Sequence, residues 1–108
     1  MSLRLPEPLA RYFETERSRD VAAQTQCFTE DAIVTDEGQT YRGASAISAW
    51  KEEAQQKFNY ECEPLSAHQA DNVVTVKVRI SGNFDGSPVD LDHAFTLAGD
   101  KISSLAID

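Results

Sequence analysis

The strongest constraint on the fold is a change of hydrophobic period after Phe58. Beyond this residue apolar and polar side chains alternate, first through Tyr60 and Cys62 and then through the valines and isoleucine of residues 74–80. A period of two is typical of strands with one buried face. Turn signals at residues 71–72, 85–88 and 99–100 divide this region. The sequence therefore predicts an antiparallel sheet with long strands near 59–70, 73–84, 89–98 and 101–107.

The first half of the chain carries helical periodicity instead. The spacing predicts a helix over residues 6–17, and Asp20 can cap a second helix over residues 20–28. A third helix is expected over residues 44–57, with Trp50 on its inner face and a run of charged and amide side chains, Lys51 among them, largely on the other side.

Two short β-rich stretches, residues 32–35 and 40–43, lie between the second and third helices and predict a small hairpin around Asp36-Glu37-Gly38. Helices followed by a meander give an α+β architecture in which the helices cover one face of a strongly bent sheet. Such a sheet encloses a cavity. We expect one domain over residues 1–108.

Acidic composition narrows the range of partners. The chain has 108 residues, with 10 Lys and Arg against 18 Asp and Glu, for a formal charge of −8. Because no basic cluster exceeds a pair, neither nucleic acid nor a membrane surface is an expected partner. The N-terminus lacks the apolar stretch of a signal peptide, so a cytoplasmic location is expected.

Metal and cofactor chemistry has little support in the motifs. Cys27 and Cys62 are expected to be free thiols, and no spacing typical of a zinc site occurs. Asp90, Asp92 and His93 form one acidic and histidine cluster, but alternation sends His93 to the opposite face from the two aspartates. Neither a serine nucleophile motif nor a glycine-rich phosphate loop is present, so no cofactor and no metal are expected.

The segment from Phe28 to Ile47, FTEDAIVTDEGQTYRGASAI, follows LARYF at residues 9–13 and precedes the four-strand meander with its final LAGDKI turn. Over nearly the whole chain this order resembles the nuclear transport factor 2-like superfamily and, more narrowly, its SnoaL-like branch. The resemblance implies a cystatin-like cone of three N-terminal helices packed on a strongly curved antiparallel sheet. It also implies a homodimer through the outer face of that sheet.

The superfamily includes ketosteroid isomerases, polyketide cyclases, dehydratases and epoxide hydrolases, along with members that only bind or dimerise. Compared with the isomerases, Tyr12 matches the tyrosine of the oxyanion hole and Asp36 matches the general base. The position of the protonated aspartate falls on Asp92 in one register and on Leu91 in the other. Alternation favours the second register, because it turns Leu91 and His93 toward the cavity.

Each of these residues has two interpretations. Asp36 is either a base in an apolar cone, where it can shuttle a proton α to a carbonyl, or part of a solvated turn whose carboxylate caps backbone amides. Tyr12 is either an oxyanion donor or a core tyrosine. His93 is either an acid, base or polar anchor, or a histidine of the core or of a dimer interface.

Aromatic side chains provide candidate ligand contacts. They either stack against a planar ligand or belong to the plain core, and Tyr41 beside Arg42 can gate the mouth of the site. The candidates are Phe28, Tyr41, Trp50, Tyr60 and Phe95.

Two hypotheses for function follow. The first is a protein that binds a small apolar carbonyl compound and isomerises, cyclises or dehydrates it without a cofactor, with Asp36 as the base and Tyr12 or His93 as its partner. The second is a non-catalytic ligand-binding or dimerisation module of the same fold.

Overall fold

The computed structural model describes residues 4–108, and within this range an α-helical part precedes most of the strands. The helices are α1 (Glu7–Ser18), α2 (Val21–Thr25) and α3 (Ala44–Lys57). The strands are β1 (Phe28–Asp36), β2 (Gln39–Arg42), β3 (Tyr60–Ala70), β4 (Val73–Gly82), β5 (Val89–Ala98) and β6 (Lys101–Ile107). None of the helices in this range is long and apolar enough to cross a membrane.

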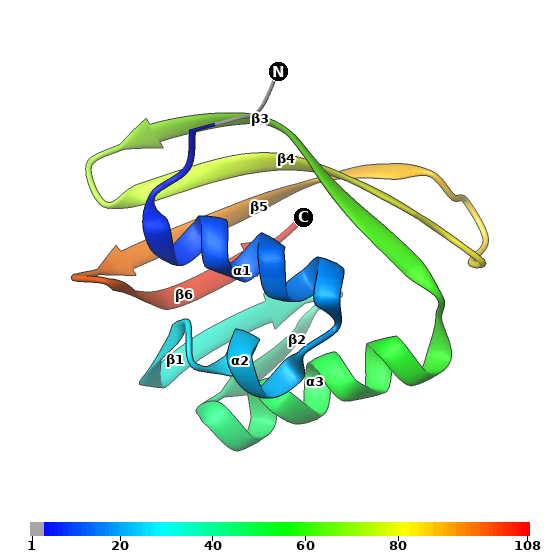
Figure 1. Ribbon diagram of the computed structural model, residues 1–108, viewed down its shortest axis with the longest axis horizontal. Helices are drawn as coiled ribbons and strands as arrows, with labels where there is room; N and C mark the ends of the chain where they lie inside the picture. Colours follow the sequence, from blue (N-terminus) through cyan, green and yellow to red (C-terminus); the bar gives the residue numbers. More distant parts are fainter. Residues whose placement is uncertain (1–3) are drawn as a thin grey trace.

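All of these strands belong to one sheet with the order β2-β1-β6-β5-β4-β3, and the helices lie together on its inner side (Figure 1). The meander from β3 to β6 is antiparallel and confirms the predicted strands to within two residues at each end. Strand β1 pairs with β2 in an antiparallel hairpin and with β6 in a parallel pair. The parallel pair brings the two halves of the chain together.

The second helix is shorter than predicted. Asp20 caps it as expected, since its carboxylate accepts a hydrogen bond from the Ala23 amide at 3.1 Å. The helix ends at Thr25, however, because the backbone then joins the sheet: the Ile102 amide donates to the Cys27 carbonyl at 2.8 Å. Phe28 is therefore the first residue of β1, and that strand is longer than the predicted 32–35.

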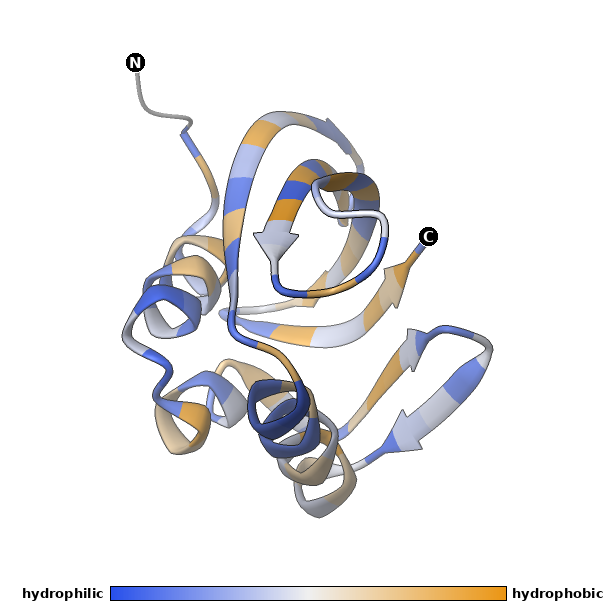
Figure 2. Ribbon diagram, turned by 90° about the vertical axis from the view of Figure 1, so that its right-hand side faces the viewer, coloured by the Kyte–Doolittle hydropathy of each residue, from blue (hydrophilic) through white to orange (hydrophobic). Residues whose placement is uncertain are grey.

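Curvature of the sheet has local causes. The β3–β4 register shifts between Pro64 and Ser66, where proline provides no amide hydrogen for the ladder. A second shift, between Thr96 and Leu97, interrupts the β5–β6 pair. Such irregularities bend strands and increase their twist. The sheet accordingly curls around the helices, with hydrophobic and hydrophilic bands alternating along the strands (Figure 2).

The core fills one end of this curved sheet. Alternation holds along β4, where Val74, Val76 and Val78 are buried while Lys77 and Arg79 are exposed. Helix α1 contributes its apolar face to the same core. The largest fully buried side chains there include Leu9, Tyr12, Phe95, Ile102 and Leu105. The opposite end, where β1 and β6 finish and β3 and β5 begin, is left less completely filled.

Candidate functional site

A cavity of about 470 Å³ occupies this second end, between α3 and the inner face of the sheet. Volumes of this size are typical of small-molecule sites. Its lining is mainly aromatic and aliphatic with a few ionisable groups. The lining residues are Trp50, Phe58, Tyr60, Phe84, Ala54, Cys62, Ile80, Val89, Leu91, Ile107, Glu16, Asp36, Glu37, Lys51, Asp85 and His93.

Strand register explains which side chains meet there. Asp36 pairs with Ile107 on the parallel strand β6, and Ile107 pairs in turn with His93 on β5. These three residues form one row across three strands. Because neighbouring strands are about 4.8 Å apart, Asp36 and His93 lie roughly 10 Å apart at the Cα atoms. The register therefore places two polar groups on opposite sides of an apolar one.

Asp36 ends β1 just before a tight turn in which Glu37 and Gly38 both have positive φ, at 51° and 75°. A turn of this kind suits a two-residue hairpin. The half-buried Asp36 carboxylate accepts a hydrogen bond from the Trp50 indole, with Nε1 and Oδ2 3.0 Å apart. The donor of this hydrogen bond, Trp50 of α3, also lines the cavity.

His93 is 3% exposed and lies beside Phe13 and Phe95. Its Nδ1 atom is the one buried side-chain nitrogen or oxygen within residues 4–108 that has no hydrogen-bond partner. Burial, together with the nearby Lys51 ammonium, lowers the pKa of His93 to about 4. The imidazole is therefore neutral at neutral pH and has hydrogen-bonding capacity to spare.

A buried ion pair forms another part of the cavity wall. Lys51 Nζ lies 2.7 Å from Glu16 Oε1, and both side chains are about 95% buried, with exposures of 6% and 5%. The Gln24 amide also donates to Glu16, at 3.2 Å, and the Tyr60 hydroxyl lies 3.4 Å from Nζ. Burial and the Glu16 carboxylate raise the pKa of Tyr60, so its hydroxyl stays protonated.

The sequence did not indicate this pair. Lys51 was expected on the solvated side of its helix, and that expectation is wrong: its ammonium turns inward to meet a carboxylate from α1. Glu16 and Lys51 are 35 residues apart, so no local pattern links them. Cys62 was also missed as a lining residue, although its place on the alternating face of β3 was a usable signal. Burial raises the pKa of the Cys62 thiol to about 12.

Several predicted site residues lie outside the cavity lining. Tyr12 is 1% exposed and makes edge-to-face contacts with three phenylalanine rings, those of Phe13, Phe28 and Phe95. These residues form the core beside the cavity. Burial raises the pKa of Tyr12 well above its usual range.

Asp92 and Tyr41 also lie away from the lining. Asp92 is exposed on the outer face of the sheet, 3.4 Å from Lys77, because alternation turns Leu91 and His93 inward. The register that places Leu91 in the cavity is thus the one observed. Tyr41 packs against the Trp50 ring at a centroid distance of 6.0 Å. Of the predicted residues, the cavity brings together Asp36, Trp50, Tyr60 and His93.

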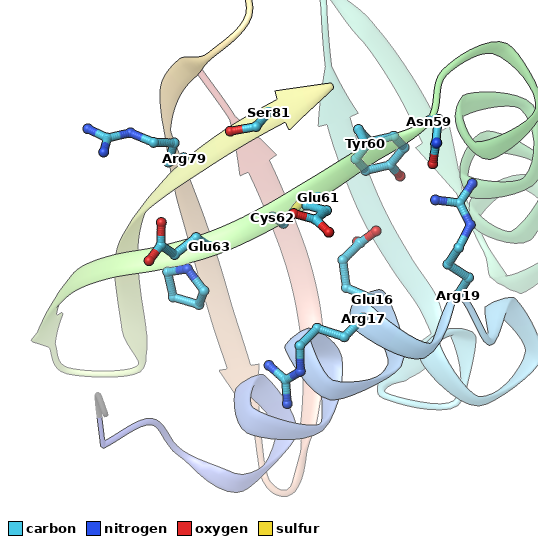
Figure 3. Close-up of a pocket in the computed structure, with 11 residues that line it drawn as sticks. Glu16, Arg17, Arg19, Asn59, Tyr60, Glu61, Cys62, Glu63, Arg79 and Ser81 are labelled. Carbon is cyan, nitrogen blue, oxygen red and sulfur yellow. The ribbon is translucent and has the colours of Figure 1, made fainter. Parts of the chain in front are cut away.

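A second cavity of about 520 Å³ lies between the end of α1 and β3 (Figure 3). Glu16, Tyr60 and Cys62 line both cavities, so they form the wall between them. The rest of the lining of this second cavity includes three arginines, Arg17, Arg19 and Arg79, together with Glu61 and Glu63. Arg19 is held by the Gln55 carbonyl at 3.1 Å. The mixed charges favour neither anions nor cations.

No group of three or more histidine, cysteine, aspartate or glutamate side chains suited to a metal ion occurs over residues 4–108.

A sequence profile of the SnoaL-like domain matches residues 9–105. The chain belongs to the SnoaL-like family. A candidate polyketide cyclase from Sinorhizobium meliloti is 35% identical, with a TM-score of 0.94 over 96% of this chain and 95% of that one. No curated protein matches the chain.

More distant structures share the fold of this SnoaL-like chain. A protein with a ketosteroid isomerase-like fold from Catenulispora acidiphila is 21% identical, with a TM-score of 0.85 over 97% of this chain and 86% of that one. A cystatin-fold protein from Novosphingobium aromaticivorans is 19% identical, with a TM-score of 0.81 over 99% of both chains. The profile match confirms the expected SnoaL-like membership, and these structures confirm the expected cystatin-like architecture.

Proposed function

We propose that this SnoaL-like protein binds a small, largely apolar carbonyl compound in the 470 Å³ cavity and catalyses a proton transfer without a cofactor. Isomerisation, cyclisation and dehydration of such compounds all begin with removal of a proton α to a carbonyl. The observation that carries the proposal is the Asp36 carboxylate at the cavity wall, held by the Trp50 indole at 3.0 Å. Similarity to a candidate polyketide cyclase supports the same class of chemistry.

Asp36 acts as the general base in this proposal. One carboxylate oxygen, Oδ2, is held by the indole, and the other is available to the ligand. The base takes a proton from the carbon next to the carbonyl. The electron pair of that C–H bond forms a C=C bond, and the π pair of the carbonyl moves to its oxygen. Return of the proton to another carbon completes an isomerisation. In a cyclisation the enolate carbon attacks a second carbonyl, the π pair of that carbonyl moves to its oxygen, and the resulting alkoxide takes the proton back from Asp36.

His93 anchors a polar group of the ligand. The His93 ring lines the cavity, and its Nδ1 is buried in the wall without a hydrogen-bond partner, which is costly, so a turn of the ring that brings Nδ1 to the cavity lets a ligand hydroxyl satisfy it. Because its pKa is about 4, the imidazole recognises the ligand as a neutral group. The aromatic rings of the lining lower the local polarity, and polar contacts are stronger in such surroundings.

A ligand screen tests this function. Wild type, Asp36→Asn and Asp31→Asn are incubated with a steroid-like enone, a polyketide-like 1,3-diketone and a simple cyclic enone, and native mass spectrometry and thermal shift measure binding. Asp31 is exposed on the same strand, so its substitution is a matched control. We expect binding by all three proteins and turnover by wild type and Asp31→Asn, with a loss of about 10²–10⁴-fold in Asp36→Asn.

The screen also decides the alternative. If a ligand binds and none is converted by any of the three proteins, the protein is a binding module. If nothing binds and the protein is a stable dimer, the cavity is closed to ligands and the fold serves assembly.

A further inference from the structure

Lys51 provides a buried ammonium that the proton transfer described above does not use. Its Nζ lies 2.7 Å from Glu16 Oε1 and 3.4 Å from the Tyr60 hydroxyl. An ammonium has three N–H donors. These two acceptors leave one donor without an oxygen partner among residues 4–108, and the side chain lines the 470 Å³ cavity.

The Trp50 ring connects this ammonium with the proposed base. Lys51 Nζ lies over the face of the indole, 4.5 Å from the ring centroid, whereas the Asp36 carboxylate accepts from the N–H at the edge of the same ring. One rigid side chain of α3 thus contacts both charges. Base and ammonium have fixed positions at the same wall of the cavity.

The charges around the cavity single out Lys51. It is the only lysine or arginine in the described lining, which also contains the carboxylates of Glu16, Asp36, Glu37 and Asp85. A ligand oxygen that becomes negative is repelled by these carboxylates, and among the charged groups of the lining only the ammonium attracts it. The charge of the Lys51 ammonium also reaches His93, because after burial it is the largest cause of the lowered pKa of that imidazole.

Stability alone does not explain the pair. Burying two charges has a desolvation cost that a hydrophobic pair of similar volume avoids, so replacement by such a pair is often neutral or stabilising. An ammonium kept at a cavity wall with a spare donor is instead suited to an oxyanion.

We propose that Lys51 binds the carbonyl oxygen of the ligand and stabilises the negative charge that develops there. The site then selects compounds with an acidic enol or phenol form, such as 1,3-dicarbonyl and phenolic compounds. The proton goes from carbon to Asp36 and none leaves Lys51, so the ammonium is unchanged through the step. This role rests on the proposed function, because it uses the same cavity.

Bound 4-nitrophenol tests the charge directly, since its absorbance distinguishes phenol from phenolate. The pKa of the bound probe is measured by titration in Glu16→Gln and in the double variant Glu16→Gln/Lys51→Met. These two proteins differ only at residue 51, which carries an ammonium in the first and an uncharged side chain in the second. We expect the bound pKa to be lower in the single variant by about one unit or more, a tenfold preference for the phenolate.

Wild type gives a second comparison if the single variant does not fold, because its bound pKa is also expected to be below that of the double variant. Equal pKa values with and without Lys51, or no binding of 4-nitrophenol at millimolar concentration, would overturn the proposal. Deuterium exchange of a ketone by wild type is measured separately. If wild type does not accelerate deuterium exchange but Lys51 still lowers the pKa of the bound probe, only the proposed proton transfer is refuted. If wild type accelerates exchange but the pKa of the bound probe is the same with and without Lys51, only the role of Lys51 is refuted.

Discussion

At the scale of single residues, His93 combines deep burial with an unpaired nitrogen, and this makes stability depend on pH. Its pKa is about 4 in the folded protein and ~6.5 in an unfolded chain. As pH falls through 6.5 the unfolded state gains a proton that the folded state does not, so stability is lost between these values and the loss stops below pH 4. At pH 5 the cost is about 2 kcal/mol.

Urea unfolding of wild type and His93→Gln at pH 7 and pH 5 measures this effect. Wild type is expected to lose about 2 kcal/mol more than the variant on acidification. His68→Gln is the control, because His68 is exposed. An equal loss in wild type and His93→Gln would contradict the lowered pKa.

Trp50→Phe keeps an aromatic ring but removes the indole N–H that holds Asp36. Hydrogen bonds to charged groups contribute about 1.5–3 kcal/mol, and partial exposure of Asp36 reduces this, so we expect a loss of about 1 kcal/mol in unfolding free energy. Turnover should fall while ligand affinity changes little, because the base is no longer held in one position. Unchanged kcat in a folded variant would show that the indole does not position the base.

The direction of single side chains was predicted correctly where strand alternation alone determines it. Alternation along β5 was enough to turn His93 and Leu91 inward and Asp92 outward. It failed for Lys51, because a charged side chain on a helix normally faces water, and only the distant Glu16 makes its burial possible.

At the scale of elements, the Glu16–Lys51 pair joins α1 to α3 across the wall of the cavity. Lys51→Met leaves a buried carboxylate without its cation, so we expect a loss of about 3–5 kcal/mol in unfolding free energy. The double variant Glu16→Gln/Lys51→Met removes both charges and should lose much less. Urea unfolding of both proteins measures the difference. Equal losses would mean that packing, rather than charge, makes this contact important.

Element prediction was accurate for the meander, because period two and turn residues are local signals. It missed the parallel pairing of β1 with β6, which joins segments about 70 residues apart in sequence. That pairing brings Asp36 into the row that contains His93. The sequence therefore indicated Asp36 and His93 as candidate site residues, but it did not indicate that they lie in the same row of the sheet.

At the scale of the whole molecule, we propose that the outer face of the sheet forms a homodimer interface. Small side chains, Thr75, Ala94 and Ala106, form one row across β4, β5 and β6. The Arg79–Asp90 and Lys77–Asp92 ion pairs lie on the same face. A row of small side chains with ion pairs beside it suits a self-complementary contact.

Native mass spectrometry tests the interface. Wild type is expected at twice the 11.9 kDa mass of one chain. Ala94→Arg places a charged side chain in the middle of the row and should give a monomer with unchanged urea stability at low protein concentration. A monomeric wild type at tens of micromolar would exclude the interface.

The proposed proton transfer depends most on Asp36 as the base, and hydrogen exchange tests this role without knowledge of the natural substrate. 2-Tetralone is an apolar ketone with acidic α-protons, and its uptake of deuterium from D2O can be followed by NMR. We predict that wild type and Asp31→Asn accelerate exchange at the carbons next to the carbonyl and that Asp36→Asn, still folded and still binding the ketone, does not. Equal acceleration by wild type and Asp36→Asn would contradict the assignment of Asp36 as the base.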